Sequence, residues 1–116
     1  AAAHLITTAE AVALANKAGV SPEKLLSGLN KGSGRSAVSE VNFPRWVLNG
    51  AFDSGFTMGL MRKDVGLADA LANAEKMNLP LSEKVMELWK KSAETLADPE
   101  DFNAIESMGA RSKNCG

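Results

Sequence analysis

Apolar residues recur every three or four positions along most of this chain, which is the spacing of a helix with one buried face. In the first run the apolar positions are Leu5, Ala9, Val12 and Ala13. Gly19 is placed to end this helix in the left-handed conformation that glycine adopts at little cost. Ser21 and Pro22 match the N-cap and first position of a second helix, whose apolar positions are Leu25, Leu26 and Leu29.

The middle of the chain predicts a third helix followed by a loop. The helix covers about residues 36–48, with Pro44 as a kink or break inside it. Its apolar positions are Val38, Val41, Trp46 and Val47. Residues 49–56 are rich in Asn, Asp, Ser and Gly, a composition typical of loops. We expect Phe52 and Phe56 to anchor this loop.

The longest periodic segment predicts a helix over about residues 57–77. Its expected apolar arc consists of Leu60, Met61, Val65, Leu67, Ala68, Leu71 and Ala72. The opposite, polar face is expected to carry Arg62, Asp69, Asn73 and Lys76.

Two further helices are predicted near the end of the chain. Ser82 is expected to cap the first, whose apolar positions are Val85, Leu88, Trp89, Ala93 and Leu96. The second lies near residues 99–108 and buries Phe102 and Ile105. Because no segment alternates like a strand, the predicted fold class is all-α, with a single helical domain over residues 1–108. The polar residues 109–116 are expected to form a disordered tail.

Composition narrows the function classes. The 116 residues suit one domain, and 45% hydrophobic with 23% charged residues is ordinary for a globular protein. A net charge of −1 gives no long-range attraction to nucleic acid or anionic membranes, and the apolar runs are too short to cross a bilayer. Cys115 and His4 are single residues of their types, which argues against a disulfide or a metal site. The composition favours a cytoplasmic domain without nucleic-acid or membrane partners.

The chain enters its first apolar run without a capping residue. Residues 1–3 are alanines, and no Ser, Thr, Asp or Asn precedes the run. We therefore expect residue 1 to lie inside a longer helix and the chain to be a fragment. No basic segment with a cleavage motif indicates a signal peptide.

The turn Gly32-Ser33-Gly34-Arg35-Ser36 opens onto the predicted start of a helix. Free backbone N–H groups, together with Arg35, could hold a carboxylate or a phosphate there. An ordinary helix–helix connector fits the same pattern, and the strand that precedes a dinucleotide fingerprint is missing. Both interpretations stay open on the residues alone.

Lys63 and Asp64 interrupt the apolar arc of the longest helix. Asp64 projects from the middle of that arc, where a carboxylate is costly unless it is paired or hydrogen-bonded. Lys63 borders the arc, from which a long cation could reach into a cleft. The alternative is a core aspartate satisfied by a neighbouring helix end, beside a lysine that is merely solvated. The sequence contains no complete catalytic combination of residues.

These features occur together in one family. The motif-bearing segments are Leu-Asn-Lys-Gly-Ser-Gly-Arg-Ser at 29–36, Leu-Met-Arg-Lys-Asp-Val-Gly-Leu-Ala at 60–68, and shorter matches at 8–11, 18–23, 56, 79–81 and 101–102. In this order and spacing they resemble the C-terminal domain of the β-hydroxyacid, or 3-hydroxyisobutyrate, dehydrogenase family. The resemblance runs from residue 5 to about residue 106.

The resemblance implies an all-α domain like the C-terminal domain of 6-phosphogluconate dehydrogenase. Family members place it after a Rossmann domain that binds NAD or NADP, form oligomers through it, and oxidise a small 3-hydroxy acid to its semialdehyde. Their catalytic lysine, in a Lys-x-x-Asn-Asn motif, would lie before Ala1, so no catalytic residue is expected in this chain. The chain alone is therefore expected to be inactive.

Site residues follow from the resemblance position by position. Lys63 matches the lysine that reaches the nicotinamide and substrate, and Phe56 matches an aromatic residue on the cofactor side of the cleft. Asp64 matches the adjacent acid, with a supporting structural role. The turn Ser33-Gly34-Arg35-Ser36 matches the loop that closes near the substrate.

Two positions depart from relatives that act on 3-hydroxyisobutyrate. Ala37 stands where those relatives often have tryptophan, and Asn42 where they have tyrosine. Both changes are expected to enlarge or polarise that wall of the substrate site. A more polar hydroxy acid is therefore expected to fit as well as 3-hydroxyisobutyrate does. The rival function is a non-catalytic oligomerisation scaffold of the same family, which lacks the upstream lysine.

Overall fold

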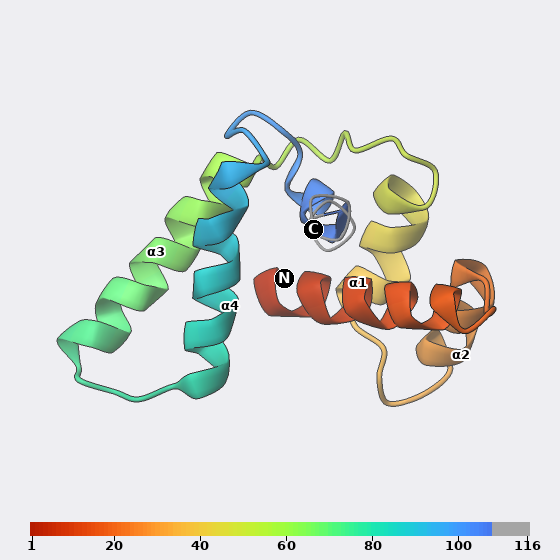
Figure 1. The fold of residues 1–116 in the computed structure, drawn as a ribbon, viewed down its shortest axis with the longest axis horizontal. Coiled ribbons are helices and arrows are strands. Elements are labelled where there is room, and N and C mark those ends of the chain that lie inside the picture. The colour runs from red at the N-terminus through yellow and green to blue at the C-terminus, as the bar shows by residue number, and fades with distance from the viewer. Residues whose placement is uncertain (108–116) are drawn as a thin grey trace.

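The computed structural model describes residues 1–107 and contains only helices and loops (Figure 1). The helices are α1 (Ala2–Lys17), α2 (Pro22–Asn30), the π-helix η1 (Val38–Val47), α3 (Met58–Ala74), α4 (Pro80–Lys91) and the 3₁₀ turns η2 (Ser92–Glu94) and η3 (Phe102–Ser107). Within that described part, the single extended pairing is an isolated antiparallel bridge between Thr57 and Asp101. The predicted all-α class is confirmed.

The helices form two groups joined by α1. Figure 1 shows α3 and α4 side by side at one end, and α2 and η1 around the far half of α1. The 3₁₀ turn η3 lies between them and packs against α1, α3 and η1. The core residues come from all of these elements: Leu5, Leu26, Val38, Phe43, Met58, Met61, Val65, Met86, Trp89, Leu96, Phe102 and Ile105. The indole N–H of Trp89 donates to the Ala2 carbonyl at 3.3 Å, which ties α4 to α1.

Local signals place several helix ends where the sequence predicts them. Gly19 follows α1 with φ = 90°, the left-handed conformation expected of a helix stop. The Ser21 hydroxyl accepts from the Lys24 N–H, and Pro22 is the first helical residue. Thr57 caps α3 by accepting from the Leu60 N–H at 3.2 Å.

The third helix differs from the prediction in its winding. Pro44 does not break it, because η1 is wound as a π-helix, in which the Leu48 N–H donates five residues back to Phe43. Because Pro44 has no N–H, it cannot donate to the carbonyl of Ser39, five residues before it. The Asn30 side-chain amide donates to this carbonyl instead, at 3.1 Å.

Three predicted boundaries are wrong. The helix α4 begins at Pro80 and not at Ser82, because proline suits the first helical position and no side-chain cap bond is made. Its α-helical part ends at Lys91, so Leu96 is buried from the following loop. The last helix is a 3₁₀ turn that begins at Phe102, with Phe102 and Ile105 buried as predicted. Residues 109–116 lie outside the described residues.

The expected apolar arc of α3 is also wrong, since it divides between two faces. Met61 and Val65 are buried, but Leu60, Leu67 and Leu71 are exposed by 47%, 62% and 63%. Arg62 and Asp69, predicted on the solvent side, are half-buried. The Asp69 carboxylate pairs with the Lys90 ammonium at 2.7 Å, so this side of the helix faces α4.

Candidate functional site

The loop before α3 carries Phe56 in a fixed position. The loop is irregular, with positive φ at Phe52 (44°) and at Gly55 (87°). The ring of Phe56 meets the Phe102 ring edge-on, with centroids 5.2 Å apart and planes at 82°. The Phe102 N–H donates to the Phe56 carbonyl at 2.9 Å. Phe56 is therefore attached to η3 through both its ring and its backbone.

Asp101 is the polar centre of this region. Its Oδ2 accepts from the Ser54 N–H at 2.8 Å and from the Ser54 hydroxyl at 2.5 Å. Its Oδ1 accepts from the Asn103 N–H at 3.0 Å and from the Asn103 side-chain amide at 2.8 Å. Burial by itself would raise the pKa of Asp101, but the hydrogen bonds from Ser54 and Asn103 outweigh it and hold the pKa below its ordinary value.

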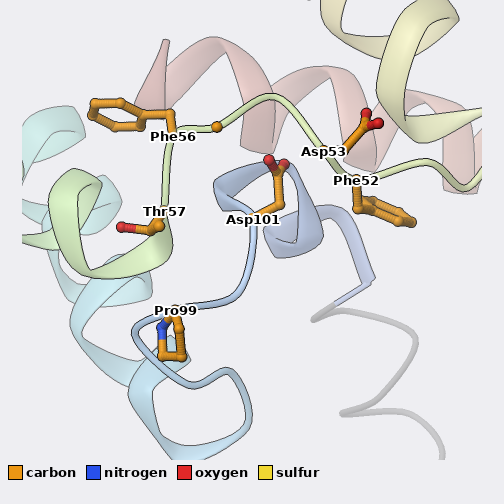
Figure 2. A pocket seen from close by; sticks show the side chains of 7 residues that line it. Phe52, Asp53, Phe56, Thr57, Pro99 and Asp101 are labelled. Atoms are coloured by element: carbon orange, nitrogen blue, oxygen red, sulfur yellow. The ribbon is translucent and has the colours of Figure 1, made fainter.

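A shallow pocket of about 300 Å³ lies along this loop (Figure 2). Its lining residues are Phe52, Asp53, Gly55, Phe56, Thr57, Pro99 and Asp101. Figure 2 shows the Asp101 carboxylate directed at the loop that runs from Phe52 to Phe56. The lining offers aromatic surface and carboxylate oxygens but no lysine or histidine. The pocket can hold an edge of a ligand.

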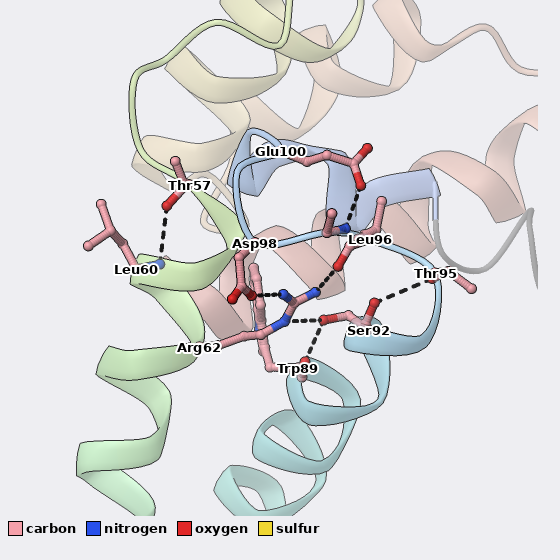
Figure 3. Close-up of polar contacts among 10 residues, drawn as sticks. Thr57, Leu60, Arg62, Trp89, Ser92, Thr95, Leu96, Asp98 and Glu100 are labelled. Atoms are coloured by element: carbon pink, nitrogen blue, oxygen red, sulfur yellow. Dashed lines mark hydrogen bonds and ion pairs between the residues drawn. The ribbon is translucent and has the colours of Figure 1, made fainter.

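Arg62 joins α3 to the segment that follows α4 (Figure 3). Its side chain is only 14% exposed, and its guanidinium pairs with Asp98 at 2.6 Å and donates to the Leu96 carbonyl at 2.5 Å. Its Nε donates to the Ser92 hydroxyl at 3.2 Å, and that hydroxyl donates in turn to the Trp89 carbonyl. These bonds fix the first turns of α3, on which Lys63 stands.

Lys63 and Asp64 both face solvent in the second turn of α3. Neither side chain makes a hydrogen bond or an ion pair to any other residue in the range 1–107. The prediction that Asp64 lies in a buried arc is wrong, because the leucines around it are themselves exposed. The supporting role expected of Asp64 therefore has no side-chain hydrogen bond or ion pair behind it within the described residues. Arg62, two residues earlier, does make such bonds.

The turn at residues 32–36 lies away from these groups. Figure 1 shows the connection between α2 and η1 below α1, in the half of the molecule that holds α2 and η1, whereas α3 lies in the other half. Arg35 donates to the Gly32 carbonyl at 3.0 Å and faces Glu40 at 3.7 Å. The Ser36 N–H donates to the Ser39 hydroxyl at 2.8 Å. The structure brings Phe56 and Lys63 onto neighbouring segments but does not bring this turn to them.

Asn42, one of the two positions that depart from the relatives, lies in the interior of the domain. It is 9% exposed, and its amide donates to the Asn103 Oδ1 at 2.8 Å. Asn42 therefore extends the hydrogen-bond chain of Asp101 and Asn103 into η1. Ala37, the other departure, is exposed at the start of that helix.

The described part of the chain holds no cluster of three or more His, Cys, Asp or Glu that could bind a metal ion. Over the same residues, no helix is long and apolar enough to span a membrane.

Sequence reasoning missed the roles of Arg62 and Asp101. A sequence signal for the role of Arg62 is Gly59, one turn earlier in the helix. A Cβ at this position would lie 3.0 Å from the Asp98 Cβ. A glycine inside a helix often marks such a close approach. Asp101 bonds to Ser54 across 47 residues, and no local pattern reports a contact at that separation.

Comparisons with known proteins agree on one family. The model described as "NAD-binding of NADP-dependent 3-hydroxyisobutyrate dehydrogenase" matches residues 1–108. The chain is 29% identical over 102 residues to 2-(hydroxymethyl)glutarate dehydrogenase of Eubacterium barkeri, covering 88% of this chain and 34% of that protein. It is 33% identical over 109 residues to 3-hydroxyisobutyrate dehydrogenase of Pseudomonas aeruginosa, covering 87% of this chain and 37% of that protein. The chain thus spans about a third of the length of these curated relatives.

Solved structures show the same likeness. The 3-hydroxyisobutyrate dehydrogenase of Mycobacterium tuberculosis, solved with L-serine, superposes with a TM-score of 0.84 at 31% identity, over 92% of this chain and 38% of that one. The Salmonella typhimurium enzyme gives a TM-score of 0.81 at 25% identity, over 92% of this chain and 37% of that one. Because the family model covers nearly every residue, the chain belongs to the family of 3-hydroxyisobutyrate dehydrogenase NAD-binding domains.

Proposed function

We propose that this chain is the C-terminal helical domain of an NAD(P)-dependent dehydrogenase that oxidises a small 3-hydroxy acid to its semialdehyde in the cytoplasm. The observation that carries the proposal is the outer face of α3, where the unpaired Lys63 stands among exposed leucines. An unpaired cation at the border of an apolar surface suits a cleft that a second domain closes over an anionic ligand.

The residues present fit part of a dinucleotide site. The Lys63 side chain has no partner within the described residues, and Phe56, seven residues earlier in the loop before α3, offers a half-buried aromatic surface. The described elements include no parallel sheet with a glycine-rich turn, the usual support for a pyrophosphate. We therefore assign the phosphates to an N-terminal Rossmann domain, and Lys63 and Phe56 to the nicotinamide end.

The chemistry divides between that domain and this one. A nicotinamide, when bound, would supply the acceptor for the hydride of the hydroxyl-bearing carbon, and the hydroxyl proton would pass to the lysine that the resemblance places before Ala1. In this chain, the Lys63 ammonium attracts the substrate carboxylate and orients it, while Phe56 limits the space beside the nicotinamide ring. Asp64 supports the surface around Lys63 once the second domain covers it.

The substrate proposal draws on the relatives. The M. tuberculosis enzyme was solved with L-serine, a compound that carries a carboxylate and a β-hydroxyl group. We propose that the substrate of the present protein is a small β-hydroxy carboxylate of this kind. In the proposal, the turn Ser33-Gly34-Arg35-Ser36 contacts substrate bound by a neighbouring subunit or after domain closure, because this turn and α3 lie in different halves of the domain in Figure 1.

Self-association is part of the same proposal. Met77 and Leu81 are each more than half exposed at the turn of the α3–α4 hairpin. Apolar residues gathered on one element are typical of a contact surface. We propose that this hairpin packs against a second subunit in a symmetric oligomer.

The test compares this chain alone with the longer dehydrogenase that contains it. With 3-hydroxy acids and NAD⁺ or NADP⁺, the longer protein should produce NAD(P)H, followed at 340 nm. The chain alone should fold by circular dichroism and produce none. Failure of the longer protein to reduce either nucleotide with a panel of 3-hydroxy acids contradicts the enzymatic function and favours the scaffold. Turnover by the chain alone contradicts the division of roles.

A further inference from the structure

Asp101 bridges two segments, the loop before α3 and the 3₁₀ turn η3, which also meet through the Phe56 and Phe102 rings. Its Oδ2 holds the Ser54 N–H and hydroxyl of the loop, and its Oδ1 holds the N–H and amide of Asn103 in η3. Each carboxylate oxygen thus serves one segment. Asn103 is itself fixed, since its Oδ1 accepts from the buried Asn42 of η1. The carboxylate therefore anchors the loop to the core of the domain.

Phe56 is positioned through this anchor. Its N–H donates to the Ser54 hydroxyl at 3.3 Å, and that hydroxyl is the group that donates to Asp101. Its carbonyl accepts from Phe102, the residue after Asp101. Its ring lies edge-on against the Phe102 ring. The N–H, carbonyl and ring of Phe56 all depend on Asp101 or on its neighbours in sequence.

The loop needs such an anchor because its own conformation is unfavourable. Phe52 has φ = 44°, in the region that side chains other than glycine seldom adopt. On the far side of Phe56, the Met58 N–H donates to the Glu100 carbonyl at 2.7 Å, and α3 begins. Position 56 is therefore held from α3 on one side and from Asp101 on the other.

We propose that Asp101 is a positioning residue for the dehydrogenase reaction: it holds Phe56 at the wall of the nucleotide cleft and thereby sets nucleotide affinity. This rests on the proposed function, in which Phe56 lies beside the nicotinamide. Asp101 itself touches neither substrate nor nucleotide. Its carboxylate accepts four hydrogen bonds, and an amide cannot replace it, because –NH₂ would face the donors of Ser54 or of Asn103.

The first measurement uses Asp101→Asn in this chain and follows amide hydrogen exchange by NMR. We expect the Phe56 and Phe102 N–H groups to exchange about tenfold faster, since hydrogen bonds to a charged acceptor are lost. The matched control is Glu100→Gln, which neutralises the adjacent acid. Glu100 bonds only the Ala97 N–H through its side chain and should leave both amides protected. Unchanged exchange in Asp101→Asn overturns the anchor.

The second measurement uses the same variants in the longer dehydrogenase. Asp101→Asn should raise KM for the nucleotide about tenfold and keep kcat within about twofold, because the wall is displaced and the reacting groups are not. Glu100→Gln should match wild type. A purely structural role predicts a lower melting temperature with unchanged KM, and that result overturns the proposal. Should Asp101→Asn fail to fold, Ser54→Ala takes its place, because it removes only the hydroxyl on the loop side of the anchor. The same changes in nucleotide KM and kcat are then expected of it.

The two failures are distinguishable. An inactive wild-type dehydrogenase refutes the proposed function and, with it, the catalytic meaning of the anchor. An active wild type with unchanged nucleotide KM in Asp101→Asn and Ser54→Ala refutes the inference about Asp101 alone.

Discussion

The two long faces of α3 carry similar apolar residues in opposite surroundings. On the inner face Met58, Met61 and Val65 are at most 8% exposed and pack in the core. On the outer face Leu60, Leu67 and Leu71 are exposed by 47% to 63%. By spacing alone, either face would serve as the buried side of the helix.

The polar residues on these faces separate them more sharply. On the inner side, Arg62 bonds to Asp98, Leu96 and Ser92, and Asp69 pairs with Lys90. On the outer side, Lys63 and Asp64 have no partner among residues 1–107. Polar groups near a buried surface are satisfied when that surface belongs to the fold. The inner face therefore maintains the domain, and we infer that the outer face contacts a second domain and its ligands.

The largest expected effect separates the faces by stability. Met61→Ala should lower the free energy of unfolding by about 2–5 kcal/mol, because it opens a cavity in the core. Leu67→Ala, a matched truncation six residues along on the outer face, should change it by less than about 0.5 kcal/mol. Urea denaturation of this chain measures both. Equal losses in the two variants would show that the outer leucine is also buried in solution.

The smaller expected effect concerns pH. The pKa of Asp101 is lowered in the folded state, so its contribution to stability is present above its unfolded pKa and is lost as pH falls through its folded pKa. The free energy of unfolding should therefore fall below about pH 4. Asp101→Asn should flatten this fall by less than about 1 kcal/mol, since the group is partly exposed.

The control for the pH effect is Asp64→Asn on the outer face, which removes an acid without a partner in the described structure. Urea midpoints between pH 3 and pH 7 supply the comparison. If Asp64→Asn reduces the pH dependence of unfolding as much as Asp101→Asn does, the acid sensitivity does not come from Asp101.

Local chemistry made much of the fold predictable. The helices, the stop at Gly19 and the start at Ser21 and Pro22 each depend on a few adjacent residues, and the structure confirms them. The inner face of α3 was not predictable, because the choice between its two apolar stripes depends on α4 and η3. Polar residues within the inner stripe, such as Arg62, make that face look exposed by pattern alone.

The candidate site divides in the same way. The segment Leu-Met-Arg-Lys-Asp-Val-Gly-Leu-Ala at 60–68 and Phe56 could be recognised by resemblance, since their order along the chain is informative. The role of Asp101 could not, because it arises from contacts with Ser54, Asn103 and, through Asn103, the buried Asn42. Such contacts exist only after the chain has folded. The roles of Lys63 and Phe56 remain predictions.

The most direct test of the outer face is Lys63→Ala in the longer dehydrogenase that the proposed function assigns to this domain. Losing a charge-assisted contact to the substrate costs about 1.5–3 kcal/mol, so kcat/KM should fall by about tenfold to more than a hundredfold. The fold should be unchanged, because the exposed Lys63 side chain has no hydrogen-bond or ion-pair partner among the described residues and alanine is a good helix former. Lys91→Ala, which removes an exposed lysine from the end of α4, is the matched control. The account predicts reduced kcat/KM in Lys63→Ala alone, with both melting temperatures at the wild-type value. Full activity in Lys63→Ala, or early melting of that variant, would contradict it.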